Sequence, residues 1–218
     1  MEATASLEGT ASLEGTAAAT PPCAERGGTR MRKIVLMSSV SLDGFFEGPD
    51  RDISWHRVND ELLSYLNGQF RATGAFMYGR VTYELMASYW PTADQSPGLS
   101  APMLDFAGIW RDIPKFVFSK TIAQAGWNTT VMSGVVPEQI AELKAQPGGD
   151  IILSGPNLAA SFIRHGLVDE IRVYVNPVVL GQGVPLLQVP EVRMNLTLKQ
   201  TRTFGNGVVL LHYARDDD

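Results

Sequence analysis

Residues 31–218 alternate between two hydrophobic patterns, one typical of strands and one typical of helices. The run IVLMSSV at 34–40 is apolar and β-branched and ends at the turn residues SLDG, as expected for a buried strand. Over 59–71, leucines and a phenylalanine recur at helical spacing behind Asn59 and Asp60, either of which can cap a helix N-terminus. The region therefore opens with a strand followed by a helix.

The same criteria extend this alternation to the end of the chain. They predict a loop over the Pro-, Gly- and Ser-rich stretch 91–102 and a C-terminal β-hairpin closed by Gly205-Asn206-Gly207. They predict further strands at 75–78, 115–119, 130–132, 150–153, 171–175, 196–204 and 208–213, and further helices at 83–90, 137–145 and 158–163. This order indicates a three-layer α/β domain with a mixed sheet, in which ligands bind at the carboxyl ends of the strands.

Residues 1–30 have a different character. TASLEG occurs twice within 4–15, and paired prolines and glycines follow, so the stretch cannot assemble a packed face. It also lacks the continuous apolar segment of a secretory signal. We therefore expect residues 1–30 to be a disordered, low-complexity tail and 31–218 to be the folded domain. A reading frame that is over-extended upstream of Met31 is one explanation of the tail.

Composition narrows the function classes. The formal net charge is −5 and the sequence pI is near 5.2, which argues against a broad basic surface for nucleic acid. A single cysteine, Cys23, excludes an internal disulfide and a multi-cysteine metal site. No apolar run approaches the roughly 18 residues of a membrane helix. We expect a soluble, cytoplasmic protein that binds neither nucleic acid nor membrane and holds no metal.

Three strand-to-helix or strand-end turns carry candidate binding residues. At Gly79-Arg80-Val81-Thr82 a glycine precedes a helix N-terminus, where free N–H groups, Arg80 and Thr82 could bind a phosphate. A plain helix start, with Arg80 solvated and Thr82 as a cap, explains the spacing equally well. Ser154-Gly155-Pro156-Asn157 repeats the arrangement, but taken alone this segment is better explained as an ordinary turn with Pro at the first helical position. Ser119-Lys120 ends a strand and could bind a ribose 2′-phosphate, although such residues more often form a simple polar turn. No GxGxxG fingerprint accompanies these turns.

Two loop segments carry candidate substrate contacts. Asp43 directly follows a buried strand and precedes two phenylalanines, where burial would raise its pKa towards values useful for proton transfer. The alternative for Asp43 is a simple Asp-Gly turn. Trp55 lies in a loop and could cover a substrate, or pack as part of a lid. The acidic pair Asp169-Glu170 is expected to cap or be solvated at the start of the half-exposed strand 171–175.

Three segments resemble a known family. MRKIVLMSSVSLDGFFEG at 31–48, YGRVTYE at 78–84 and HGLVDEIRVYVNPVVLGQG at 165–183 occur in the order and spacing of the dihydrofolate reductase superfamily. They are most similar to the branch of the reductase domain of the bacterial riboflavin-biosynthesis deaminase–reductase. The resemblance covers essentially all of 31–218.

The resemblance implies a fold and a cofactor. It implies an α/β/α domain around a mixed, mostly parallel sheet of about eight strands, which binds NADPH in extended form. The cofactor contacts it implies are Gly79, Arg80 and Thr82 at the phosphates, Ser119 and Lys120 at the adenosine 2′-phosphate, and Ser154, Gly155, Pro156 and Asn157 at the pyrophosphate and nicotinamide. It places Asp43 at the nicotinamide and substrate, as the candidate catalytic residue.

One departure from the family pattern affects the substrate. Riboflavin reductases usually carry a Glu-Gly-Gly turn where this chain has Leu153-Ser154-Gly155, so the pyrimidine substrate is less certain than the fold. A single cysteine also cannot supply the zinc ligands of the deaminase half of those enzymes.

Three hypotheses follow. The leading one is an NADPH-dependent reductase similar to 5-amino-6-(5-phosphoribosylamino)uracil reductase, which transfers a hydride to a small substrate. The second is a stand-alone reductase of another small carbonyl, imine or pterin-like compound. The third is a non-catalytic NADPH-binding dimeric module. Because members of this family commonly dimerise, we expect a homodimer that pairs through the strands near 171–179 or through the terminal hairpin.

Overall fold

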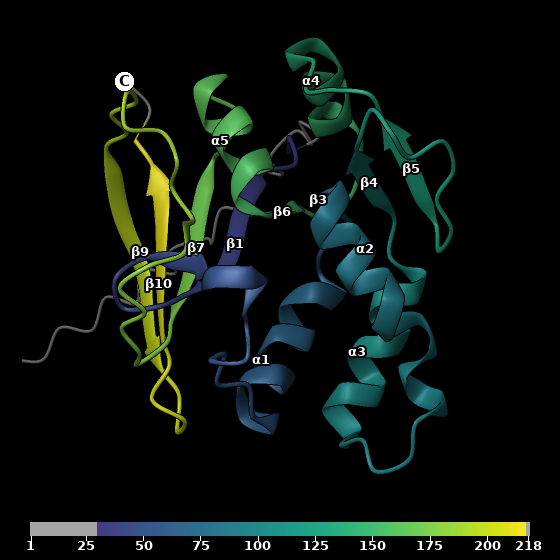
Figure 1. Cartoon of the computed structure of the whole chain (residues 1–218). Coiled ribbons are helices and arrows are strands. Elements are labelled where there is room, and N and C mark those ends of the chain that lie inside the picture. The colour runs from purple at the N-terminus through teal and green to yellow at the C-terminus, as the bar shows by residue number, and fades with distance from the viewer. Residues whose placement is uncertain (1–29, 217–218) are drawn as a thin grey trace, which may run out of the picture.

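The computed structural model describes residues 30–216. The tail expected at 1–30 therefore falls outside the described residues, apart from Arg30. Eight strands form one mixed sheet in the order β5-β4-β3-β6-β1-β7-β10-β9 (Figure 1). In chain order they are β1 (Ile34–Val40), β3 (Ala75–Gly79), β4 (Lys115–Phe118), β5 (Thr129–Met132), β6 (Ile151–Ser154), β7 (Glu170–Val175), β9 (Leu196–Thr203) and β10 (Val209–Arg215).

Most neighbouring strands of this sheet are parallel. From β5 to β7 every neighbouring pair runs parallel, whereas β10 is antiparallel to both β7 and β9. The antiparallel pair of β9 and β10 is the C-terminal hairpin. The predicted mixed, mostly parallel sheet with a terminal hairpin is confirmed.

β1 lies in the middle of the sheet because its residues are apolar on both faces. Ile34, Val35 and Leu36 are completely buried. β1 pairs with β6 on one side, with Leu36 opposite Leu153, and with β7 on the other, with Leu36 opposite Ile171. Each such side chain stabilises the fold by about 1.5–3 kcal/mol relative to an exposed position. A strand covered on both faces has the continuous apolar pattern seen at 34–40.

Five α-helices cover the two faces of the sheet (Figure 1). They are α1 (Asp60–Arg71), α2 (Arg80–Tyr89), α3 (Ala101–Asp112), α4 (Pro137–Ala145) and α5 (Pro156–Arg164). Buried residues of α1, α2 and α3 share one hydrophobic cluster with one face, and those of α4 and α5 share another with the opposite face. The predicted three-layer architecture is therefore confirmed.

The N-terminus of α1 shows why the sequence pattern predicts this helix. The side chain of Asn59 accepts a hydrogen bond from the backbone N–H of Leu62 at 3.0 Å, which satisfies one of the free donors of the first turn. Leu62 and Leu63 are buried against the sheet. A capped start and a buried apolar stripe together position α1.

The segment predicted as a loop over 91–102 is largely helical. A 3₁₀ helix, η2 (Trp90–Gln95), continues from α2 through Pro91, and α3 begins at Ala101. Pro and Gly residues weaken the helical pattern of α3 in the sequence. Phe106 and Trp110, one turn apart, are nevertheless buried in the core. Tertiary packing therefore determines this helix more than local propensity does.

A second, two-stranded sheet lies beside the first and was not predicted. It pairs β2 (Phe45–Glu47) with β8 (Val184–Pro185) in antiparallel fashion. Gly183 has φ +143°, and a Cβ atom there would clash with the carbonyl oxygen of Glu47. Only glycine allows this close approach of the two segments. A further 3₁₀ turn, η1 (Pro49–Arg51), follows β2.

The start of β7 differs from the sequence expectation. Tyr174 is buried, so the strand is covered on both faces rather than half-exposed. Glu170 is also buried, forms ion pairs with Lys33 at 2.6 Å and Arg172 at 3.1 Å, and shares a hydrogen bond with His212 at 2.8 Å. Burial alone would raise the pKa of Glu170, but hydrogen bonds from Lys33 and His212 lower it to about 2. Glu170 is thus the centre of a polar cluster and not a solvated cap.

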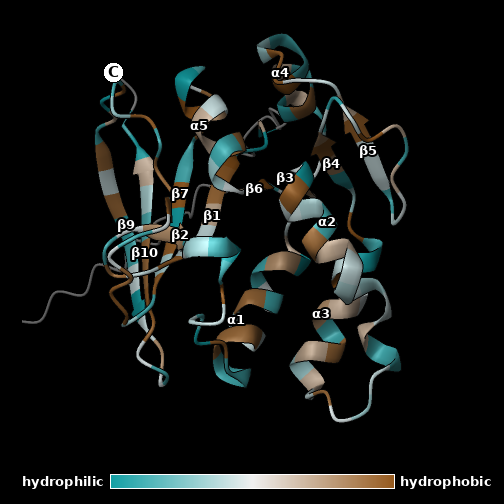
Figure 2. Cartoon of the chain, viewed as in Figure 1, coloured by the Kyte–Doolittle hydropathy of each residue, from teal (hydrophilic) through white to brown (hydrophobic). Residues whose placement is uncertain are grey.

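Hydrophobic residues concentrate where the layers meet. In Figure 2 they recur along the central strands, while polar residues mark the outer turns of the helices. Within residues 30–216 no helix combines the length and apolar character needed to cross a membrane.

Candidate functional site

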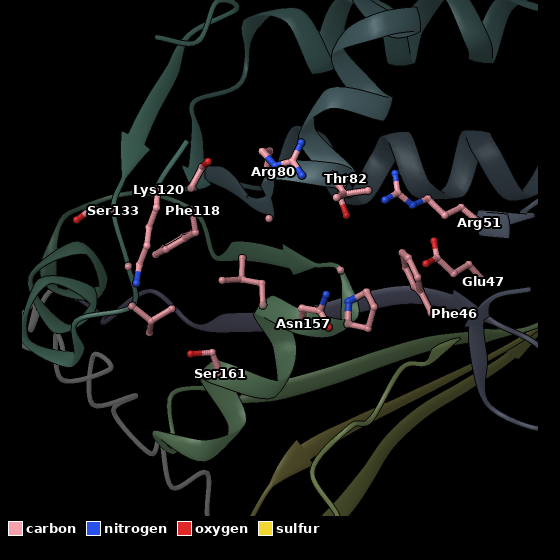
Figure 3. Close-up of a pocket in the computed structure, with 18 residues that line it drawn as sticks. Phe46, Glu47, Arg51, Arg80, Thr82, Phe118, Lys120, Ser133, Asn157 and Ser161 are labelled. Carbon is pink, nitrogen blue, oxygen red and sulfur yellow. The ribbon is translucent and has the colours of Figure 1, made fainter. Parts of the chain in front are cut away.

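A pocket of about 520 Å³ opens at the carboxyl ends of β3, β4 and β6 (Figure 3). This is the edge of the sheet where the sequence analysis places the ligand. Its lining combines the N-terminal turns of α2 and α5 with the ends of β2, η1, β4 and β5. The lining residues are Phe46, Glu47, Arg51, Gly79, Arg80, Val81, Thr82, Phe118, Ser119, Lys120, Ser133, Gly134, Val135, Gly155, Pro156, Asn157, Leu158 and Ser161.

The first predicted turn presents the N-terminus of α2 to this pocket. Gly79 is the N-cap residue, and within the described part of the chain no side chain caps the helix there. The free N–H groups of the first turn are therefore available to an anion. Arg80 lines the pocket and donates to both carboxylate oxygens of Glu84, at 3.1 and 2.9 Å. The structure thus brings Gly79, Arg80 and Thr82 together as predicted.

The second predicted turn presents the N-terminus of α5 to the same pocket. Gly155 has φ +102°, and a Cβ atom at this position would lie 2.8 Å from Oγ1 of Thr82. Glycine is required here, both for its backbone conformation and because α2 and α5 meet at this point. Gly155, Pro156 and Asn157 all line the pocket.

Ser154 is the one residue of this turn that does not line the pocket. Its hydroxyl lies 3.4 Å from that of Ser38, at the carboxyl ends of β6 and β1. Ser154 is not among the residues with positive φ, so serine fits where family members carry glycine. Leu153 before it is completely buried in the core, so no polar group takes the place of the family's glutamate.

The third predicted turn lies at one end of the pocket. The side chain of Ser119 accepts hydrogen bonds from the N–H groups of Thr121 and Ile122, at 3.1 and 3.0 Å, which fixes the turn after β4. Lys120 is exposed and extends along the pocket (Figure 3). Within residues 30–216 its ammonium group has no ion-pair partner. It is a free cation for an anionic ligand.

Asp43 lies outside the pocket lining. Its carboxylate accepts hydrogen bonds from the hydroxyl of Ser41 at 2.6 Å and from the N–H groups of Leu180 and Gly181, at 3.2 and 2.8 Å. The hydrogen bond from Ser41, with those from the two backbone groups, lowers the pKa of Asp43 to about 2. The expectation of a pKa raised by burial is wrong. In this geometry Asp43 fastens its loop to residues 180–181, and its catalytic role stays a prediction.

Trp55 also lies outside the pocket lining. Its indole N–H donates to the carbonyl oxygen of Asp52 at 3.0 Å, and its ring contacts His56 edge to face, with centroids 4.2 Å apart. His56 is packed in this loop, and burial lowers its pKa. The contacts hold the loop in place, and a contact of Trp55 with substrate stays a prediction.

The pocket includes residues that the sequence analysis did not select. Phe46, Glu47 and Arg51 come from the segment after β1, whereas Ser133 follows β5 and Ser161 lies on α5. Ser133 shares the strand-end signal that identifies Ser119. The other four reach the pocket only through tertiary folding, and no local pattern distinguishes them.

The charges of the lining favour an anion. Arg51, Arg80 and Lys120 outnumber the one carboxylate, Glu47. In Figure 3 the cations are spread along the pocket, with Lys120 and Arg51 at opposite ends and Arg80 between them. Two helix N-termini add partial positive charge between the ends. The site therefore suits an extended ligand with more than one phosphate.

This geometry agrees with the family to which the chain belongs. The family model described as RibD C-terminal domain matches residues 32–210. The chain belongs to this family. One relative is the uncharacterized protein YyaP of Bacillus subtilis (strain 168), 33% identical over 190 residues that cover 84% of this chain and 95% of YyaP. The resemblance drawn from the three sequence segments is confirmed.

Solved structures show the fold. The deaminase/5-amino-6-(5-phosphoribosylamino)uracil reductase of Thermotoga maritima superposes with a TM-score of 0.58 at 13% identity, covering 85% of this chain and 57% of its own. Dihydrofolate reductase from Enterococcus faecalis, complexed with NADP(H) and RAB-propyl, superposes with a TM-score of 0.57 at 12% identity, covering 85% of this chain and 97% of its own. The domain thus has the dihydrofolate reductase-like fold predicted from the sequence.

Proposed function

We propose that this protein is an NADPH-dependent reductase that resembles 5-amino-6-(5-phosphoribosylamino)uracil reductase and transfers a hydride to a small substrate. The observation that carries the proposal is the pocket itself. Two uncapped helix N-termini meet there beside Gly155, and a free lysine lies at one end. Membership of the RibD C-terminal domain family and the dihydrofolate reductase-like fold support the same activity.

The residues present fit an extended dinucleotide phosphate. Lys120 and Ser119 would hold the 2′-phosphate, because they supply a free ammonium group and a hydroxyl group from the turn after β4. The first turns of α2 and α5 would hold the diphosphate through their N–H groups. Thr82 and Asn157 add polar side chains between these points. When bound, the nicotinamide would supply the hydride.

The protein's own contribution would be orientation and exclusion of water. Phe46 and Phe118 give the pocket apolar walls, and Phe118 packs edge to face on Phe162 with centroids 5.5 Å apart. Gly155 lets the two helix N-termini approach closely enough to share one ligand. None of these tasks needs a residue with a shifted pKa.

A second candidate is a stand-alone reductase of another small carbonyl, imine or pterin-like compound. The observation that favours it is the buried Leu153, which stands where riboflavin reductases usually carry a polar glutamate. The pocket supports the cofactor equally in both cases. The two candidates differ only in the substrate.

Calorimetric titration of the full chain with NADPH and with NADH tests the proposal. We expect micromolar binding of NADPH and much weaker binding of NADH. Oxidation of NADPH, followed at 340 nm with the riboflavin intermediate and then with other carbonyl and imine compounds, separates the two candidates. If neither cofactor binds, the reductase proposal fails. If NADPH binds but no compound is reduced, the alternative of a non-catalytic NADPH-binding module is favoured.

A further inference from the structure

Arg51 stands in an unusual backbone conformation at the pocket. It closes η1, where both Asp50 and Arg51 have left-handed φ values, 55° and 61°. Two consecutive non-glycine residues in this region are strained, and such strain concentrates at functional sites. An arginine held in this way needs a turn that is fixed by its surroundings.

The surrounding segment supplies that fixation. The N–H of Gly48 donates to the carbonyl of Asp52 at 2.8 Å, and the N–H of Asp52 donates to the carbonyl of Pro49 at 3.0 Å. The indole of Trp55 donates to the same Asp52 carbonyl oxygen, and Ser54 donates from its N–H to the Asp52 carboxylate at 2.9 Å. The turn is thus closed on itself and tied to the loop that follows.

The other side of the turn is fixed by β2. Phe45 and Glu47 pair with β8, where Gly183 packs directly against the backbone of Glu47. The backbone that carries Arg51 is therefore held on both sides, and the arginine is presented to the pocket by an ordered turn. An ordered backbone lowers the entropic cost of binding a ligand through this side chain.

The side chain points to the place where the two helix N-termini meet. Arg51 lines the pocket, and in Figure 3 its guanidinium group points towards Thr82. Thr82 is the residue against which Gly155 packs. Among residues 30–216 the Arg51 guanidinium has no ion-pair partner, so its charge is available.

We infer that Arg51 binds the diphosphate of the dinucleotide, at the phosphate on the nicotinamide side. The inference rests on the proposed function. Lys120 lies at the opposite end of the pocket from Arg51. If an extended dinucleotide has its 2′-phosphate at Lys120, the phosphate on its nicotinamide side is the one nearer to Arg51. A planar guanidinium can bind a phosphate through two parallel hydrogen bonds, while the helix N-termini bind it from the other side.

Two ligands test the inference on the full chain by calorimetry. NADPH contains the whole diphosphate, whereas adenosine 2′,5′-bisphosphate lacks the phosphate on the nicotinamide side. We expect Arg51→Ala to weaken NADPH binding about tenfold, equivalent to about 1.4 kcal/mol, and to change binding of the bisphosphate less than twofold. Arg51→Lys should retain part of the affinity, because it keeps the charge but not the fork.

Two further variants separate binding from loop structure and from net charge. Arg51→Gly removes the side chain but suits the left-handed turn, so it should lose NADPH affinity as Arg51→Ala does. Arg57→Ala removes one charge from the same segment outside the pocket lining and should leave affinity unchanged.

Three results overturn the inference while the proposed function stands. They are wild-type NADPH affinity in Arg51→Ala, equal losses for both ligands, and wild-type affinity in Arg51→Gly. Absence of NADPH binding by the wild-type chain overturns the proposed function itself and is distinguishable from all three.

Discussion

Lys120 is the residue whose proposed role can be tested most directly. It is exposed at the end of the pocket, and we assign it to the 2′-phosphate that distinguishes NADPH from NADH. We expect Lys120→Ala to weaken NADPH about tenfold and NADH less than twofold in calorimetric titrations, because only NADPH carries the lost charge contact. Lys199→Ala, on the exposed strand β9, is the matched control. Equal losses of affinity for NADPH and NADH would show that Lys120 does not bind the 2′-phosphate.

Asp43 calls for a different experiment because its carboxylate contacts the protein and not the pocket. Asp43→Asn keeps the shape of the side chain but replaces one carboxylate oxygen, which accepts hydrogen bonds, with an NH₂ group, which donates them. A backbone N–H group that donates to Asp43 in the wild type would lose its acceptor, and this should shift the loop at 180–181. We expect NADPH affinity within twofold of the wild type and turnover at least tenfold lower on a verified substrate, about 1.4 kcal/mol of barrier. Since its pKa is about 2, Asp43 itself should contribute no titration to the wild-type rate above about pH 4.

The control for Asp43 is Asp94→Asn, which removes a surface carboxylate paired with Arg111 at 2.8 Å. Thermal unfolding of both variants separates a loss of turnover from a loss of folding. Turnover unchanged in a folded Asp43→Asn variant would remove Asp43 from the mechanism.

At the scale of single residues, the sequence predicts the pocket residues that belong to one strand-end turn. Arg80, Lys120 and Asn157 each follow a recognisable strand end, so their place at the pocket can be deduced from local pattern. Arg51 cannot be found in this way. Its left-handed φ and its approach to Thr82 depend on pairing between β2 and β8, which are distant in the sequence.

The junction between α2 and α5 gives a prediction at the scale of elements. In Gly155→Ala the new Cβ would meet Thr82, and φ +102° disfavours any L side chain. We expect the variant to lose about 1–3 kcal/mol of stability against urea and to bind NADPH more weakly, since the helix N-termini would separate. The measurements are urea unfolding and calorimetric titration.

Gly68→Ala is the matched control for the same chemical change. Gly68 lies exposed within α1, with no atom within 4 Å of an added Cβ. Alanine there should raise stability by about 0.5–1 kcal/mol and leave NADPH affinity unchanged. A Gly155→Ala variant as stable as the wild type would contradict the close approach of the two helices.

The elements themselves differ in how well the sequence predicts them. β1, α1 and α4 have a continuous apolar run, a capping residue or a proline at the first turn, and their bounds were predicted closely. α3 contains a proline and a glycine, and it packs against α1 and η2. β2 and β8 are too short for any periodic pattern. Local sequence signals therefore predict elements such as β1, α1 and α4, whereas α3, β2 and β8 depend on long-range packing.

At the scale of the whole molecule, the edge strand β9 of the large sheet is left uncovered. All eight residues of β9 are exposed, and Leu196 and Leu198, two positions apart, point to the same side of the strand. Lys199, which follows Leu198, lies at a register shift in the pairing with β10. Lysine and an irregular edge oppose strand-to-strand pairing. An apolar pair beside a protected edge therefore favours contact through the face of the hairpin.

We expect a homodimer that buries this face. Light scattering of the full chain should give a mass near twice 23.7 kDa. Leu198→Asp should lower the mass to that of one chain, because two like charges would face each other across a two-fold axis. Leu104→Asp places the same charge on an exposed leucine of α3 and should leave the dimer intact. A monomeric wild-type chain would exclude the dimer, and a dimer that survives Leu198→Asp would exclude this face as its interface.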